Sequence, residues 1–169
     1  GEGAIYSLKK LGKLKNKKFL IIGTGGTALT ISAYLQKFLK NKEDLTITGR
    51  NLKKLNFFGK KFQSKLIKLK NLNNQIADYD FIINCTDVGT INKNYSIINE
   101  KLFKIMNKGV KIFDVIYNPK KTPFLKLASK YKMRNENGID MNFQQAVFAF
   151  SITNKIKKSD THSISELMI

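Results

Sequence analysis

The chain has 169 residues, 42% of them hydrophobic and 11% aromatic, which is typical of a folded domain and excludes a disordered segment. Its formal net charge of +19 comes from lysines scattered along every segment and only two arginines, Arg50 and Arg134, which favours a general lysine bias over nucleic-acid binding. One cysteine, no apolar run near the roughly 20 residues of a membrane span, and no signal peptide predict a cytoplasmic protein without an intrachain disulfide.

Helix-like and strand-like segments alternate along the chain. The first half predicts, in order, a helix over 2–11, a strand over 18–22, a helix over 26–39, and strands over 45–49 and 64–69. The second half predicts a helix-like stretch over 71–77, strands over 79–86 and 109–117, a helix over 122–131, a strand over 132–137 and a helix over 139–155. This alternation predicts an α/β fold, a Rossmann-like, doubly wound parallel sheet in three layers, α/β/α.

A glycine-rich turn, "GTGGTA", joins the strand over 18–22 to the following helix. Gly23 allows a sharp turn, Gly25 lets the backbone approach a pyrophosphate, and Ala28 takes the small position where the helix meets the strand. The free N–H groups at the start of such a helix suit an anion. The same pattern also fits a turn that only packs a helix against a strand, so two interpretations remain at this point.

The residues after the second strand bear on which cofactor would bind. Cofactors with a free ribose 2′-hydroxyl usually meet an acidic residue there, but this chain has Arg50, Asn51, Lys53 and Lys54 and no acid. A guanidinium and nearby ammonium groups suit a 2′-phosphate, which predicts NADP(H) over NAD(H). The alternative is that Arg50 simply points to solvent in a lysine-rich chain.

Several segments, in the same order, resemble the C-terminal domain of shikimate dehydrogenase. They are "GEGAIYSLKKLG", "GTGGTA", "GRNLKK", "INCTDVGT", "FDVIYNPKKTPFL" and "NGIDMNFQQAVFAF". The resemblance implies reversible, NADPH-dependent reduction of 3-dehydroshikimate to shikimate, a step toward the aromatic amino acids. It also implies that 1–14 is a linking helix, that the chain is an NADP-binding domain, and that 155–169 is a C-terminal tail or helix.

The resemblance assigns roles residue by residue. The implied cofactor residues are Gly23, Thr24, Gly25, Gly26, Thr27 and Ala28 at the pyrophosphate, Arg50, Asn51 and Lys54 at the 2′-phosphate, Asn84, Thr86 and Val88 at the riboses, Ile116 beneath the cofactor, and Gly138 and Met141 at the nicotinamide. The implied substrate residues are Tyr117 on the carboxylate side and Gln145 at the ring hydroxyls. Tyr117 also fits a core tyrosine at a strand end, and Met141 fits simple packing.

Three residues depart from the family pattern. Gly49 stands where an asparagine is usual, Asp87 where a neutral residue is common, and Thr90 where a methionine is usual. A carboxylate near cofactor phosphates is unfavourable unless it points away. These departures put cofactor affinity in question more than the fold.

Ketone reduction also needs a proton donor for the forming alkoxide. In the family this is a lysine assisted by an aspartate, both in an N-terminal substrate domain that this sequence does not contain. We therefore expect no catalytic residue and no metal site in this chain, and negligible turnover by the chain alone. The alternatives are a quinate/shikimate dehydrogenase paralogue and a non-catalytic basic Rossmann module that binds nucleic acid. Substrate preference and oligomeric state, a homodimer included, are left open.

Overall fold

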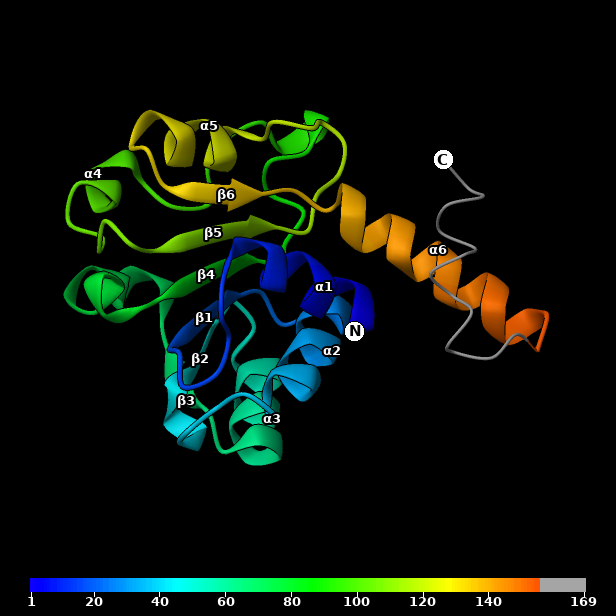
Figure 1. The fold of residues 1–169 in the computed structure, drawn as a ribbon. Coiled ribbons are helices and arrows are strands. Elements are labelled where there is room, and N and C mark those ends of the chain that lie inside the picture. The colour runs from blue at the N-terminus through cyan, green and yellow to red at the C-terminus, as the bar shows by residue number, and fades with distance from the viewer. Residues whose placement is uncertain (156–169) are drawn as a thin grey trace.

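A six-stranded parallel sheet forms the centre of the computed structural model, which describes residues 1–155 (Figure 1). The strand order is β3-β2-β1-β4-β5-β6, and every neighbouring pair is parallel. The strands are β1 (Phe19–Ile22), β2 (Leu45–Thr48), β3 (Lys65–Ile67), β4 (Phe81–Asn84), β5 (Lys111–Asp114) and β6 (Arg134–Glu136). The chain winds outward from β1 to β3 and then returns to β4 on the other side of β1, which confirms the predicted doubly wound fold.

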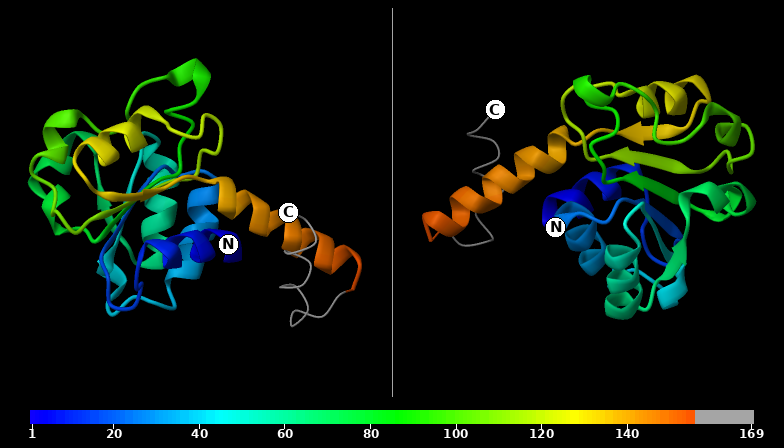
Figure 2. Two further views of the ribbon diagram at one scale, coloured as in Figure 1. Left: turned by 45° about the horizontal axis from the view of Figure 1, so that its top comes forward. Right: turned by 180° about the vertical axis from the view of Figure 1, so that it is seen from behind.

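Helices cover both faces of the sheet. The α-helices are α1 (Glu2–Leu11), α2 (Gly26–Leu35), α3 (Leu52–Phe62), α4 (Glu100–Phe103), α5 (Pro123–Lys130) and α6 (Ile139–Thr153). One buried cluster joins α1, α2 and α3 to the sheet, and a second joins α4 and α5 to the opposite face. The start of α6 packs beside α1, and the rest of the helix extends away from the sheet in both views of Figure 2.

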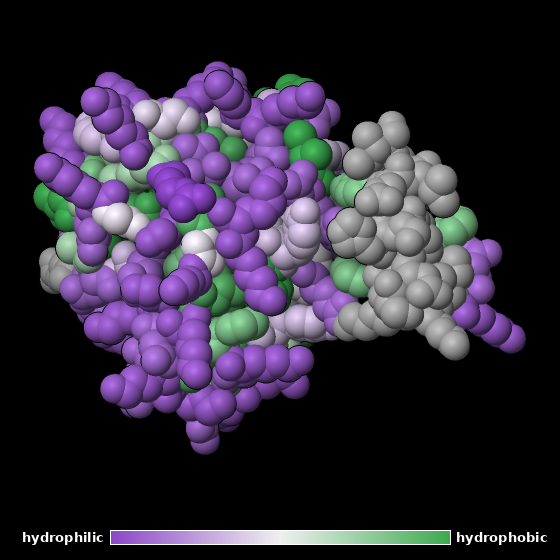
Figure 3. Space-filling model, in the orientation of Figure 1, coloured by the Kyte–Doolittle hydropathy of each residue, from purple (hydrophilic) through white to green (hydrophobic). Residues whose placement is uncertain are grey.

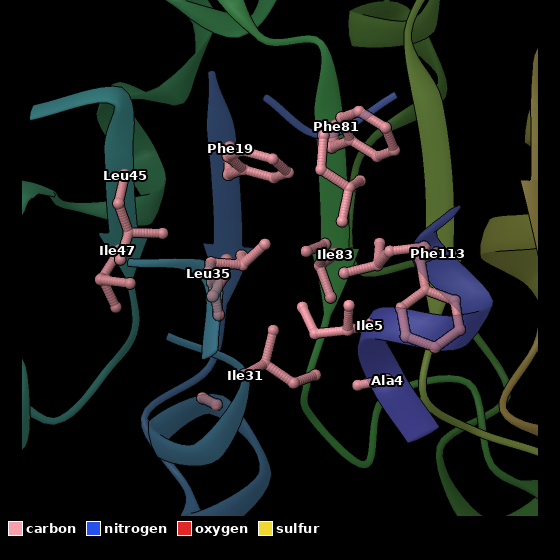
Figure 4. Close-up of a cluster of buried hydrophobic side chains, with 14 of the residues drawn as sticks. Ala4, Ile5, Phe19, Ile31, Leu35, Leu45, Ile47, Phe81, Ile83 and Phe113 are labelled. Atoms are coloured by element: carbon pink, nitrogen blue, oxygen red, sulfur yellow. The ribbon is translucent and has the colours of Figure 1, made fainter. Parts of the chain in front are cut away.

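The central strands are apolar on both sides because helices cover both faces. Phe19 and Ile21 belong to the cluster under α1, α2 and α3, whereas Leu20 and Ile22 belong to the other cluster. Figure 4 shows the first cluster, where the ring of Phe19 stacks on that of Phe81 with centroids 5.1 Å apart. A continuous apolar run such as "FLII" is therefore what a strand buried on two faces needs.

The strand register brings the chain segments of the candidate site to one level. Ile22, the last residue of β1, pairs with Thr48 of β2 on one side and with Asn84 of β4 on the other. Asn84 in turn pairs with Asp114, the last residue of β5. The turns that leave these four strands therefore lie together at the carboxyl edge of the sheet, where such sheets bind ligands.

Some sequence predictions were incomplete. The helix expected over 26–39 ends at Leu35, although Phe38 in the following turn still packs on the core. The helix α3 was not predicted, although Leu55, Phe58 and Phe62 form its buried face. The helix-like stretch over 71–77 forms short 3-10 turns at Leu69–Asn74 and Ile76–Asp78. The tail predicted beyond residue 155 lies outside the described residues.

The surface of the described chain is rich in polar side chains. Figure 3 shows hydrophilic residues spread over most of the visible face, as the scattered lysines predict. Within residues 1–155, no helix combines the length and the apolar character that crossing a bilayer requires.

Candidate functional site

A cleft of about 200 Å³ opens at the carboxyl edge where β1, β2 and β4 end. We call it the glycine-loop cleft. It is lined by Ile22, Gly23, Thr24, Gly25, Gly49, Arg50, Asn51, Lys54, Leu69, Thr86, Val88 and Ile97. The structure thus brings the predicted glycine turn, the basic residues after β2 and the turn after β4 into one site, at the point where the strand order reverses.

The glycines of the turn have two different roles. Gly23 has a φ of 123°, and a Cβ added there would lie 2.9 Å from the carbonyl oxygen of Cys85, so only glycine fits between β1 and the turn after β4. At Gly25 and Gly26, by contrast, an added Cβ would meet no atom within 4 Å. Gly23 is therefore required for packing, whereas Gly25 and Gly26 leave room above the backbone for a ligand.

The start of α2 is suited to an anion. No side chain caps this helix at Gly25, and its first turn contains no acidic residue. The partial positive charge of the helix N-terminus therefore faces the open space above Gly25 and Gly26. The pyrophosphate of a dinucleotide fits these properties.

The basic residues after β2 surround the start of α3. The side-chain oxygen of Asn51 accepts a hydrogen bond of 3.0 Å from the backbone N–H of Lys54 and so caps the helix. The oxygen is engaged as an acceptor in the cap, and the amide NH₂ group of Asn51 is a donor that can face a ligand. Arg50 and Lys54 line the same cleft and add two positive charges, so this corner suits a phosphate.

Asp87 lies outside the lining of the glycine-loop cleft, and its charge is paired with that of a lysine. It is exposed, does not line the glycine-loop cleft, and forms an ion pair with Lys93. The hydrogen bond from Lys93, with smaller help from the charge of Arg50, holds the pKa of Asp87 below its usual value. Thr90 donates its hydroxyl to the carbonyl oxygen of Asp87, 2.9 Å away, and so stabilises the same turn.

The turn after β4 is shaped by the side chain of Asn84, which is fully buried. Its amide NH₂ donates to the carbonyl of Val88 and to the carboxylate of Asp114, both at 3.0 Å. Its oxygen accepts from the backbone N–H and the hydroxyl of Thr86 at 3.0 and 2.7 Å. Asn84 thus fixes the turn that brings Thr86 and Val88 to the cleft, and its own side chain is used inside the protein. Contact of these residues with a ribose stays a prediction.

Asp114 continues this network into the next helix. Its carboxylate accepts from the backbone N–H of Ile116 at 3.2 Å and from the hydroxyl of Thr122 at 2.7 Å. Thr122 in turn caps α5 by accepting from the N–H of Leu125. Burial raises the pKa of Asp114 to about 6, although the hydrogen bonds from Thr122, Ile116 and Asn84 lower it. The sequence analysis predicted a helix that begins at residue 122 but missed Asp114, whose only signal is its place in "FDVIYNPKKTPFL".

The two predicted substrate residues meet in a separate hollow of about 590 Å³ between the end of β5 and α6. We call it the α6 hollow. It is lined by Tyr117, Ile139, Asn142, Phe143, Gln145 and Ala146. Tyr117 is 53% exposed, so the interpretation as a core tyrosine is wrong. Gln145 is exposed on the same side, and both polar groups are accessible to a ligand.

Three predicted cofactor residues are buried in the structure: Ile116, Gly138 and Met141. A Cβ added at Gly138 would lie 2.0 Å from the carbonyl oxygen of Val115, so glycine lets the start of α6 pack on the end of β5. Met141 is buried in the cluster that includes α1, in agreement with the packing interpretation, and Ile116 is also buried. None of the three lines the glycine-loop cleft or the α6 hollow. Their contact with a cofactor stays a prediction.

Nucleophilic and metal chemistry find little support in residues 1–155. Burial raises the pKa of the Cys85 thiol strongly, so the nucleophilic thiolate is disfavoured. Within that range no three residues among His, Cys, Asp and Glu are grouped as metal ligands would be. The arrangement as a whole suits binding of a phosphorylated dinucleotide beside a small polar ligand.

Comparisons with known proteins agree with this arrangement. Residues 6–133 match the family model described as shikimate / quinate 5-dehydrogenase. A shikimate dehydrogenase (NADP(+)) of Methanococcus vannielii is 36% identical over 166 residues, which cover 90% of this chain and 55% of that protein. The crystal structure of shikimate dehydrogenase from Aquifex aeolicus superposes with a TM-score of 0.80 at 25% identity, over 97% of this chain and 59% of the other. A shikimate dehydrogenase solved in complex with NADP+ gives a TM-score of 0.76 at 26% identity, over 93% and 56%. The chain thus spans little more than half the length of each of these three proteins.

Proposed function

Because the chain belongs to the shikimate / quinate 5-dehydrogenase family, we propose that it is the NADP(H)-binding domain of an enzyme that reversibly reduces 3-dehydroshikimate to shikimate. The observation that carries this proposal is the glycine-loop cleft, in which an uncapped helix N-terminus lies beside Arg50 and Lys54. The relative from Methanococcus vannielii is named as NADP(+)-dependent, which supports the choice of cofactor. The family description includes quinate, so a quinate-using enzyme is the second candidate.

Different residues of the glycine-loop cleft would bind different parts of the cofactor. The pyrophosphate would lie over Gly25 and Gly26 at the start of α2, where the backbone leaves space. The 2′-phosphate would lie between Arg50, Asn51 and Lys54. Bound NADPH supplies a hydride to the substrate carbonyl, and the protein's part is to hold the cofactor and the substrate in register.

The substrate would occupy the α6 hollow. The hydroxyl of Tyr117 and the amide of Gln145 offer donors and acceptors for a carboxylate and ring hydroxyls. Among the residues that line this hollow there is no lysine, histidine or carboxylate, so a phenol is its only titratable group. We propose that the proton donor comes from a second domain of the complete enzyme, since this chain spans 55% of the relative from Methanococcus vannielii.

Arg50→Ala tests the choice of cofactor. We expect the Kd for NADPH to rise about 10- to 100-fold, because a hydrogen bond to a charged group contributes about 1.5–3 kcal/mol. The Kd for NADH should change far less, since NADH lacks the 2′-phosphate. Both can be measured by titration calorimetry. Lys126→Ala, which removes one positive charge from the exposed face of α5, is the matched control and should affect neither cofactor. An equal loss for NADPH and NADH would contradict the proposal.

The 169-residue chain alone should reduce NADP+ with shikimate at a negligible rate. Oxidation of a hydroxyl needs a group that accepts its proton, and the lining of the α6 hollow offers only the phenol of Tyr117, whereas a positioned acid–base group contributes about 10²–10⁴-fold to such a step. NADPH absorbance in the presence of shikimate measures this rate. A complete enzyme that contains the same 169 residues is the positive control. Robust shikimate-dependent reduction by the chain alone would refute the assignment of the proton donor to another domain.

A further inference from the structure

A second hollow lies on the other side of the glycine turn. We call it the α2–α3 hollow, and its volume is about 370 Å³. It is lined by Thr24, Gly25, Gly26, Leu29, Lys53, Lys54, Phe57 and Phe58. Thr24, Gly25 and Lys54 also line the glycine-loop cleft, so the side chain of Thr24 stands on the boundary between the two spaces.

Thr24 occupies the space that a side chain at position 49 would need. Gly49 begins the basic segment after β2, and a Cβ added there would lie 2.8 Å from the methyl group of Thr24 and 3.4 Å from its hydroxyl oxygen. Thr24 can therefore keep its position only because residue 49 has no side chain. Thr24 fills, from the glycine turn, a volume next to Gly49, the residue that precedes Arg50.

The hydroxyl of Thr24 is free to bind a ligand. Within residues 1–155, its side chain forms no hydrogen bond, and the residue is only partly buried. The side-chain oxygen of Asn51 already accepts a hydrogen bond in the cap of α3. Asn51 can therefore offer a ligand its amide NH₂ group, whereas Thr24 can offer its hydroxyl. A free hydroxyl in the cleft that Arg50 and Lys54 also line suits a phosphate oxygen.

We propose that Thr24 is a specificity-determining residue, whose hydroxyl donates to the 2′-phosphate of the cofactor in place of a side chain at position 49. The inference deepens the proposed function and rests on it, because it concerns the same cleft. Arg50 and Lys54 supply charge in the glycine-loop cleft, and Thr24 supplies a short donor to the same cleft from the glycine turn.

The first test replaces the hydroxyl with a methyl group of the same shape, in Thr24→Val. We expect the Kd for NADPH to rise about tenfold and the Kd for NADH to change by less than about twofold, as for the loss of one hydrogen bond to a charged group. Thr24→Ser keeps the hydroxyl and should bind NADPH as the wild type does. Equal effects of Thr24→Val on both cofactors, or no effect on either, would overturn the inference.

The second test uses the contact between Thr24 and Gly49. Gly49→Ala should push the Thr24 methyl aside and turn its hydroxyl away, which lowers NADPH affinity about tenfold without unfolding the protein, because only the end of a side chain has to move. In Thr24→Ser/Gly49→Ala the clashing methyl is absent, so NADPH affinity should return to that of Thr24→Ser. A Gly49→Ala variant that binds NADPH normally, or a double variant without rescue, would count against the inference.

Measurements on the wild-type protein distinguish a failure of the proposed function from a failure of the role proposed for Thr24. If the wild type binds NADPH no better than NADH, and Arg50→Ala changes nothing, the proposed function itself is wrong. If the wild type and Arg50→Ala behave as expected but Thr24→Val does not, only the role of Thr24 fails. Thermal unfolding of each variant checks that the fold is retained.

Discussion

Gly25→Leu should fold as stably as the wild-type chain and bind NADPH about 100-fold more weakly. A Cβ at Gly25 meets no atom of the protein within 4 Å, so the new side chain begins in open space. The backbone there has a φ of −88°, which any residue adopts. The space that the leucine fills is the space above the start of α2, so a pyrophosphate could no longer reach the N–H groups. Each lost hydrogen bond to a charged group weakens binding by about 1.5–3 kcal/mol.

Gly23→Ala is the matched control and should behave in the opposite way. Its φ of 123° disfavours a side chain, and the new Cβ would lie 2.9 Å from a backbone carbonyl oxygen. We expect the free energy of unfolding to fall by about 1–3 kcal/mol, as for other overpacked or strained positions. Denaturant titration and NADPH titration of both variants make the comparison. If Gly25→Leu bound NADPH as well as the wild type, the turn would be only a packing device.

Asp114→Ala should lower the free energy of unfolding by about 3–5 kcal/mol. The carboxylate is fully buried and accepts hydrogen bonds from Asn84, from the N–H of Ile116 and from the hydroxyl of Thr122. Alanine leaves two of these donors without a partner and takes one from Asn84, and each buried unpaired group costs about 1–3 kcal/mol. Denaturant titration measures the loss. Asp78→Ala, at an exposed aspartate, should change stability by only about 0.5 kcal/mol or less.

The same carboxyl group should make stability depend on pH in a defined direction. Burial raises the pKa of Asp114 from 3.8 to about 6, so the folded protein binds this proton more tightly than the unfolded chain. Its contribution is therefore fully present below about pH 4 and is lost as the pH rises through 6, by about 3 kcal/mol for a shift of about two pKa units. Asp114→Asn keeps the shape but does not titrate, so the difference between the two unfolding free energies isolates this group. A difference that stays constant from pH 4 to pH 8 would exclude the raised pKa.

Much of the fold could be predicted because each element leaves a local mark. The run "FLII" indicates a strand buried on two faces, and Thr122 followed by Pro123 marks the start of α5. The helix α3 also has local signals, in the cap at Asn51 and the spacing of Leu55, Phe58 and Phe62, but lysines fill the positions between them. The apolar spacing of α3 is therefore hidden by the lysines of its solvated face when the segment is read residue by residue. The end of α2 depends on how the chain turns toward β2, which local sequence does not determine.

Some residues of the candidate site could likewise be found from local sequence, and others could not. The glycine turn and Arg50 were found from sequence because their residue types are unusual for their positions, and Tyr117 was named through the resemblance of its segment to the family. Asp114 was missed since its role depends on Asn84, its neighbour across two strands, and on Thr122 at the start of a helix. The relation between Thr24 and Gly49 is likewise invisible in the chain, because the two residues belong to turns after different strands.

The sequence by itself determined the alternating apolar segments, and with them the doubly wound sheet, the glycine turn and the basic residues after the second strand. These features depend on backbone conformation and on burial over a few consecutive residues. Only the tertiary structure decided which glycine packs and which leaves room, which polar side chains are used inside the protein, and that Tyr117 and Gln145 share one hollow. The physical reason is that space and hydrogen-bond partners are set by segments that are distant in the chain and become neighbours only when the parallel strands pair in register.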